Sequence, residues 1–138
     1  MELKEKDKLL SIISHCDEAY AFILANGIKL YSLNDLKDAL EIMPEDLYRS
    51  HVTPYRNDFS NWIRDVFKDY ILAERITKAM NKEEAAKMIE KRIEFLKSRI
   101  DYLEELERNN ELKKIWILDF IIGFILGLAF GWLLAVII

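Results

Sequence analysis

The sequence is poor in cysteine, histidine, proline and glycine. One cysteine, Cys16, excludes an internal disulfide and any metal site built from several cysteines. His15 and His51 are the only histidines, which is too few for a zinc centre, and no cofactor or metal is expected. Two prolines and four glycines in 138 residues, with 32% charged residues, favour an ordered and mainly helical chain.

Neither sign of charge dominates any long part of the chain. Residues 1–80 carry 11 Lys/Arg and 14 Asp/Glu, and residues 81–114 carry 9 of each. No basic face stands out, so nucleic acid is not an expected partner. The first ten residues, MELKEKDKLL, lack the apolar run of a secretory signal peptide.

The one long apolar run is the last stretch of the sequence, residues 115–138. As a helix rising about 1.5 Å per residue it would reach about 36 Å, more than the bilayer core of about 30 Å. Together with Lys113 and Lys114, it predicts a single C-terminal transmembrane anchor over 113–138. The chain is therefore expected to be a tail-anchored, single-pass membrane protein. By the positive-inside tendency, the two lysines place the N-terminal part in the cytoplasm.

The first 80 residues predict a small helical domain preceded by an amphipathic helix. Residues 1–15 fit a helix that covers a neighbouring core, although a helix lying on a membrane surface is a weaker alternative. Residues 20–31 predict a β-hairpin, since two apolar runs flank Asn26-Gly27, a pair that tolerates positive φ. Helix starts are expected at Ser32, at Pro44 and at Asn57 or Asp58. The predicted domain covers 16–80 and contains one hairpin.

A long charged helix is predicted over 81–112. Its apolar residues follow a heptad seam, which is typical of a short parallel coiled coil. The seam is under three full heptads, so the alternative that it packs back on residues 16–80 stays open. The seam consists of Ala86, Ile89, Ile93, Leu96, Ile100 and Leu103.

The only polar cluster that resembles a site lies around His51 and Asp58. A histidine near an aspartate can in principle move a proton, but no nucleophile accompanies the pair in a recognisable motif. A structural role accounts better for the group: Asn57 and Asp58 cap a helix, Phe59 and Trp62 fill the core, and His51 pins a loop. We therefore predict no catalytic residue and no enzyme activity.

These residues carry a resemblance to a known domain. The order His51-Val52, then Asn57-Asp58-Phe59 and Trp62-Ile63, resembles an uncharacterised small domain family of archaeal proteins over residues 18–78. The resemblance implies a recurring module for binding or assembly. It implies no activity and supplies no catalytic residues.

The transmembrane segment carries a row of small residues on one side. Asp119, Gly123, Gly127 and Gly131 are spaced by four and share one ridge of a helix. Glycines at this spacing let two helix backbones approach closely. The ridge lies about 160–200° from the heptad seam on a straight helix, so both faces cannot serve one parallel partner. Either the helix breaks near Asn109-Asn110, or the two faces serve different partners.

Three functions are consistent with these features. The first is a membrane-tethered interaction or assembly module that associates with itself or with another membrane helix. The second is an accessory subunit that anchors a larger membrane complex and docks an unknown soluble protein. The third, which draws only on the glycine-spaced apolar helix, is a membrane-active, toxin-like protein.

Overall fold

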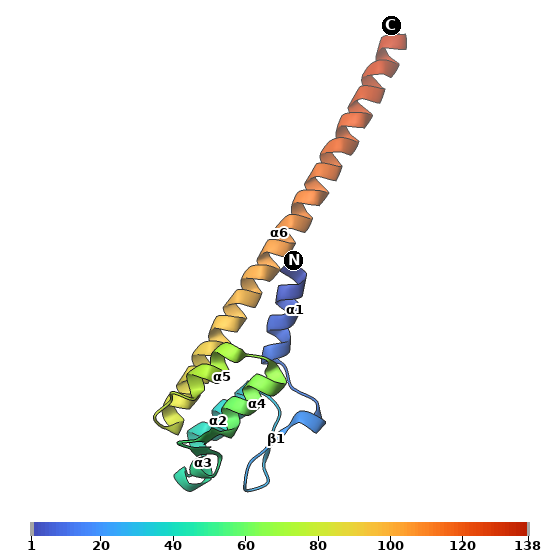
Figure 1. Cartoon of the computed structure of the whole chain (residues 1–138). Helices are drawn as coiled ribbons and strands as arrows, with labels where there is room; N and C mark the ends of the chain where they lie inside the picture. Colours follow the sequence, from blue (N-terminus) through green and yellow to red (C-terminus); the bar gives the residue numbers. More distant parts are fainter. Residues whose placement is uncertain (1, 138) are drawn as a thin grey trace. The chain divides into compact units, whose positions relative to one another are not determined.

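The computed structural model describes residues 2–137, with side chains described over 4–132. The chain divides into two compact units, Met1–Ile100 and Asp101–Ile138. The fold is mainly helical (Figure 1). In chain order its elements are α1 (Glu2–Ile13), η1 (Glu18–Tyr20), β1 (Phe22–Ile23), β2 (Lys29–Leu30), α2 (Leu33–Ile42), α3 (Glu45–His51), β3 (Val52–Thr53), β4 (Arg56–Asn57), α4 (Asp58–Trp62), η2 (Ile63–Phe67), α5 (Tyr70–Ile76) and α6 (Lys82–Ile137).

Two short antiparallel hairpins interrupt the helices. In the first, β1 pairs with β2, and Gly27 in its turn has φ +86°, a conformation that side chains with a Cβ rarely adopt. This is the predicted hairpin. The second pairs β3 with β4 around Pro54-Tyr55. The prediction of a single hairpin was therefore wrong, because two-residue strands show no alternating pattern and this turn lacks an Asn-Gly signal.

Side-chain caps fix where the helices begin. Ser32 Oγ accepts the Asp35 N–H at 3.1 Å, and Asp35 Oδ2 accepts the Ser32 N–H at 3.0 Å, which completes a capping box on α2. Asn57, rather than Asp58, caps α4 by accepting the Ser60 N–H at 2.9 Å. Pro44, expected as the first helical residue, takes the N-cap position of α3, so this helix begins one residue later than expected.

Helix α4 runs into η2, a π-helical turn. The turn ends at Lys68, whose φ of 57° lies in the left-handed region. Asp69 then caps α5, with its Oδ1 accepting the Leu72 N–H at 3.1 Å. The chain thus reverses within a few residues between two short helices, which places both of them on one core.

One hydrophobic core holds the first unit together. Buried side chains of α2, of α4 with η2, and of α5 share it with the first turns of α6, and α1 adds Ile12. The seam residues Ala86, Ile89, Ile93 and Leu96 belong to this core, and Ile100 is also buried. Of the two alternatives for the seam, the one in which it packs back on the domain is the arrangement that the structure has. A coiled-coil partner is therefore not needed to cover these four side chains.

The second unit consists of the rest of α6. Its residues stay helical through Asn109 and Asn110, so the helix break, one of the two alternatives that the sequence left open, is absent from this part of the described chain. Leu103 is buried, whereas the side chains from 108 to 132 are exposed. Within the described residues one helix is long and apolar enough to cross a membrane, with a mean hydropathy of 2.1 and none of that stretch buried.

Candidate functional site

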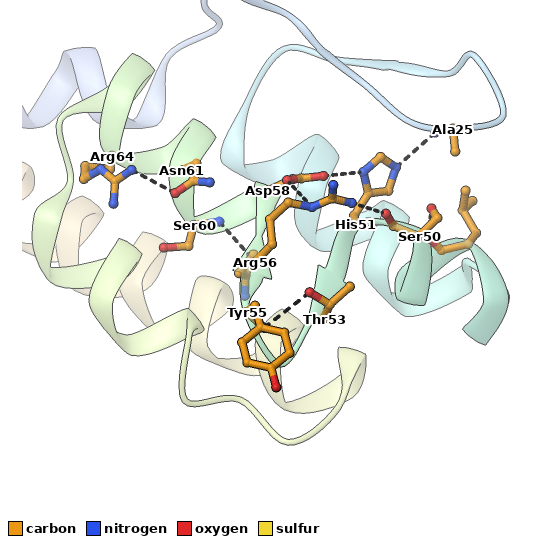
Figure 2. A network of polar contacts seen from close by, with 12 residues as sticks. Ala25, Ser50, His51, Thr53, Tyr55, Arg56, Asp58, Ser60, Asn61 and Arg64 are labelled. Carbon is orange, nitrogen blue, oxygen red and sulfur yellow. Dashed lines mark hydrogen bonds and ion pairs between the residues drawn. The ribbon is translucent and has the colours of Figure 1, made fainter.

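The ring of His51 lies at the centre of a polar network (Figure 2). Its Nε2 accepts the backbone N–H of Ala25 at 3.0 Å, and its Nδ1 lies 3.3 Å from Asp58 Oδ2. Because Nε2 accepts, the proton of a neutral ring is on Nδ1, which then donates to Asp58. The two ring nitrogens therefore join the turn of the first hairpin to the start of α4.

Asp58 is shared between two basic side chains. Its Oδ2 faces His51, and its Oδ1 lies 3.1 Å from Arg56 Nε. Arg56 also donates from Nη2 to the Ser50 carbonyl at 2.8 Å. The carboxylate thus links α3, β4 and α4, which are brought together only by the fold of the second hairpin (Figure 2).

The ring of His51 is also packed between aromatic side chains. Phe22 lies edge-on to it at 5.1 Å and Phe59 at 5.3 Å between ring centroids. With both nitrogens engaged and both neighbours apolar, no ring nitrogen is left to accept a proton from a bound molecule. Each of these contacts joins His51 to another part of the fold and so stabilises the tertiary structure.

The remaining residues of the sequence motif also stabilise the fold. Asn57 donates from Nδ2 to the Ile76 carbonyl at 3.3 Å in addition to capping α4. Phe59 is 1% exposed, and Trp62 donates from Nε1 to the Tyr20 carbonyl at 2.7 Å. The motif thus gathers α4, α5 and the first hairpin around one aromatic cluster.

A polar hollow of about 300 Å³ lies beside the second hairpin. Tyr55, at the tip of that hairpin, is 99% exposed and lines it with Arg56 and Arg64. Arg64 donates to Asn61 Oδ1 at 2.8 Å and to Asp65 Oδ1 at 3.2 Å, so both guanidinium groups are already engaged by neighbours (Figure 2). Among the described residues, no group of three or more His, Cys, Asp or Glu side chains has the arrangement of a metal site.

A buried ion pair that the sequence did not reveal joins α6 to the rest of the first unit. Arg92 donates from Nε to Asp69 Oδ2 at 2.8 Å and from Nη2 to Asp69 Oδ1 at 3.0 Å. The Asp69 side chain is fully buried, and Arg92 lies over the ring of Phe95 at 5.5 Å. No pattern in the sequence pairs Asp69 with a residue 23 positions away.

In the apolar part of α6, the predicted ridge is an open surface. A Cβ added at Gly123, Gly127 or Gly131 would meet nothing within 4 Å. The side chains around the ridge, including Asp119, are exposed, and the rings of Phe120 and Phe124 stack at 6.4 Å. The ridge has the space that close approach of another helix requires.

Comparison with known proteins places the chain in a family. No curated protein and no solved structure matches it significantly. One family model matches residues 15–122, which extends well past the expected limit of 78 and takes in the buried seam of α6. The matched region thus includes α6 as far as residue 122. The chain belongs to a family of unknown function, DUF5752.

Proposed function

We propose that the chain is a single-pass membrane protein whose first unit is a cytoplasmic interaction or assembly module without catalytic activity. The observation that carries the proposal is the apolar part of α6, helical and long enough to span a bilayer with none of its side chains buried in the protein. Exposed side chains of this kind over such a length are stable in lipid and not in water.

The orientation of the span rests on its flanking charges. Lys113 and Lys114 precede the apolar run directly, and Lys114 Nζ pairs with Glu111 at 2.7 Å. Positive charge next to a span favours the cytoplasmic side. Trp116 lies at the same end, where an indole suits the membrane interface.

The proposed assembly is self-association through the glycine ridge, Asp119, Gly123, Gly127 and Gly131. Ala86, Ile89, Ile93 and Leu96 are already covered by the chain's own core, whereas the ridge is an open face of α6 on which small residues allow close approach of a second helix. Packing between small residues stabilises helix pairs in lipid, where the hydrophobic effect does not.

Cross-linking in native membranes tests this proposal. We expect the wild-type chain to give a dimer or higher oligomer and Gly127→Ile to lose it, because a branched side chain separates the two backbones. Ala129→Ile is the matched control, since residue 129 lies about 200° around the helix from residue 127. A monomeric wild-type chain, or equal yields for the two variants, would contradict self-association.

Anchoring and topology are tested separately. Alkaline carbonate should leave the chain in the membrane pellet, and protease added to the cytoplasmic side should digest the first unit. Release of the chain by carbonate would overturn the membrane assignment itself. Protection of the first unit from that protease would reverse the orientation.

An accessory subunit of a larger membrane complex is the second candidate. It is favoured by an apolar recess on the first unit that no described residue covers. Purification in mild detergent should then yield a companion protein in fixed stoichiometry. A chain that repeatedly purifies alone would count against this candidate.

A further inference from the structure

An apolar recess of about 310 Å³ opens on the first unit between the turn of the first hairpin and the junction of α2 with α3. Two exposed isoleucines line it: Ile28 is 54% exposed and Ile42 is 84% exposed. Its volume lies at the bottom of the range of about 300–1,000 Å³ for small-molecule sites. The other apolar side chains that line it are Leu24, Leu30, Ala39, Met43, Pro44 and Leu47.

A second hollow continues this recess along the start of α3. It has a volume of about 360 Å³ and shares Asn26, Pro44 and Leu47 with the first. Asp46 is the charged residue of its lining. The two hollows are neighbours that share part of their lining, so a row of side chains from an extended or helical segment can enter both, whereas one compact ligand would fill only one.

The charged residues that line the recess are all acidic. Asp35 and Asp38 line the first hollow and Asp46 the second, and no lysine or arginine lines either. Residues 32–51 carry five acidic and two basic residues, a net charge of −3.

Both bases of this stretch are already engaged by neighbouring acids. Lys37 Nζ lies 2.7 Å from Asp38, and Arg49 Nε lies 2.8 Å from Glu45. Because Lys37 offsets Asp38 and Arg49 offsets Glu45, the acidic charge that remains is that of Asp35, Glu41 and Asp46. Of these three, Asp35 and Asp46 line the recess and can attract a basic partner.

This charge decides which occupant fits the recess. An anionic membrane surface would be repelled by the rim. A second copy placed by two-fold symmetry would set two identical acidic rims against each other. We propose that the recess binds an amphipathic, basic helix of a partner protein, which inserts aliphatic side chains between Ile28 and Ile42 and places lysine or arginine over the acidic rim. Such complementarity gives specificity and fast association.

A defined peptide tests the proposal on the full chain in nanodiscs of zwitterionic phosphocholine lipid. The probe is a labelled helical peptide of about 15 residues, long enough to sustain a helix, with leucine on one face and lysine on the other. Fluorescence anisotropy should show saturable binding above that of empty nanodiscs. A leucine/glutamate peptide of the same pattern should bind at least about tenfold more weakly, and salt should weaken the lysine peptide.

Single substitutions locate the site. Ile42→Asp and Ile28→Asp should each weaken the lysine peptide about tenfold or more. Ile71→Asp is the matched control, since Ile71 is as exposed as Ile28 but lies on α5, outside the recess. Circular dichroism checks that each variant is folded, and Ile42, the more exposed of the pair, keeps the test available if Ile28→Asp unfolds.

Several results would overturn the proposal. These are no saturable binding, equal binding by Ile42→Asp, equal affinity for the glutamate peptide, or self-association that Ile42→Asp abolishes, which would assign the recess to a second copy. Gly127→Ile should leave peptide binding unchanged. The proposal for the recess and the proposal for the glycine ridge can therefore be tested independently.

Discussion

Asp69 and Arg92 form a buried contact at which we expect a single substitution to lower the free energy of unfolding strongly. The carboxylate is fully buried, caps α5 through Oδ1 and receives two hydrogen bonds from one guanidinium group. Removing one partner of such a pair leaves a buried charge without compensation, whereas replacing both with apolar groups is often nearly neutral.

We therefore expect Arg92→Met to lower the free energy of unfolding by about 3–5 kcal/mol. Arg92→Lys should remain destabilising because an ammonium group cannot reproduce the paired geometry. Urea unfolding followed by Trp62 fluorescence, in a background with Trp116→Phe and Trp132→Phe, measures the change. Adding Asp69→Asn to Arg92→Met should recover part of the loss, and additive losses would show that the two side chains do not interact.

Cys16 is the one thiol, and its surroundings hold its pKa above the ordinary value. Burial is the main factor that raises its pKa, Asp17 and Asp35 add to the rise, and a backbone hydrogen bond opposes it. A raised pKa means less thiolate near neutral pH. Alkylation by iodoacetamide should therefore be slower in the folded chain than in urea, with its pH midpoint moved upward.

The same shift has a consequence for stability. The folded state holds the thiol proton more tightly than the unfolded state does. The stabilisation is present below the ordinary thiol pKa of about 8.5 and is lost as pH rises through the higher folded pKa. Cys16→Ser should remove the decrease in the free energy of unfolding that Cys16 contributes over this pH range. An unchanged pH dependence in the variant would contradict this account.

Among the elements, the short hairpins and turns depend on two residues with positive φ. Gly27, in the first hairpin, has φ +86°, and Lys68, after the π-helical turn, has φ 57°. Glycine adopts such angles without steric cost, whereas a residue with a Cβ is strained by about 1–2 kcal/mol. Both positions require a positive φ, which Gly27 adopts without strain and Lys68 adopts with strain.

Gly27→Ala should lower the free energy of unfolding by about 1–2 kcal/mol, because it introduces that strain. Lys68→Gly should change the free energy of unfolding by only a few tenths of a kcal/mol, since the strain that is relieved is offset by greater freedom of the unfolded chain. Thermal unfolding of the two variants side by side measures both effects. Equal losses would show that backbone conformation is not the cause.

For the whole molecule, α6 contributes to two different environments. Its first turns fill a water-soluble core, and its later turns expose apolar side chains along a length that matches a bilayer. Stability of the first unit and association in the membrane should therefore respond to different substitutions.

Ile89, fully buried in the core, provides the contrast with Gly127. Ile89→Ala should lower the free energy of unfolding by about 2–5 kcal/mol and leave the cross-linked oligomer unchanged at temperatures where the variant is folded. Gly127→Ile should do the reverse. Loss of the oligomer in folded Ile89→Ala would instead indicate that the heptad seam takes part in self-association.

Local sequence patterns sufficed wherever neighbouring residues decide the structure. The Asn26-Gly27 turn, the capping box of Ser32 with Asp35 and the apolar length of residues 115–138 were all readable, because each depends on a few adjacent side chains or on local composition. The partners of His51, the Ala25 N–H and the Asp58 carboxylate, could not be identified from such patterns.

Contacts between distant parts of the chain were decided by the tertiary structure. His51 meets Ala25 across 26 positions, and Arg92 meets Asp69 across 23. The seam residues Ala86, Ile89, Ile93 and Leu96 lie in one core with buried residues of α2, α4 and α5. A stripe of apolar side chains shows only that one helix face needs covering. Whether a second chain or the same chain covers it depends on which surface folding brings within reach, and in this protein that surface is the core of its own first unit.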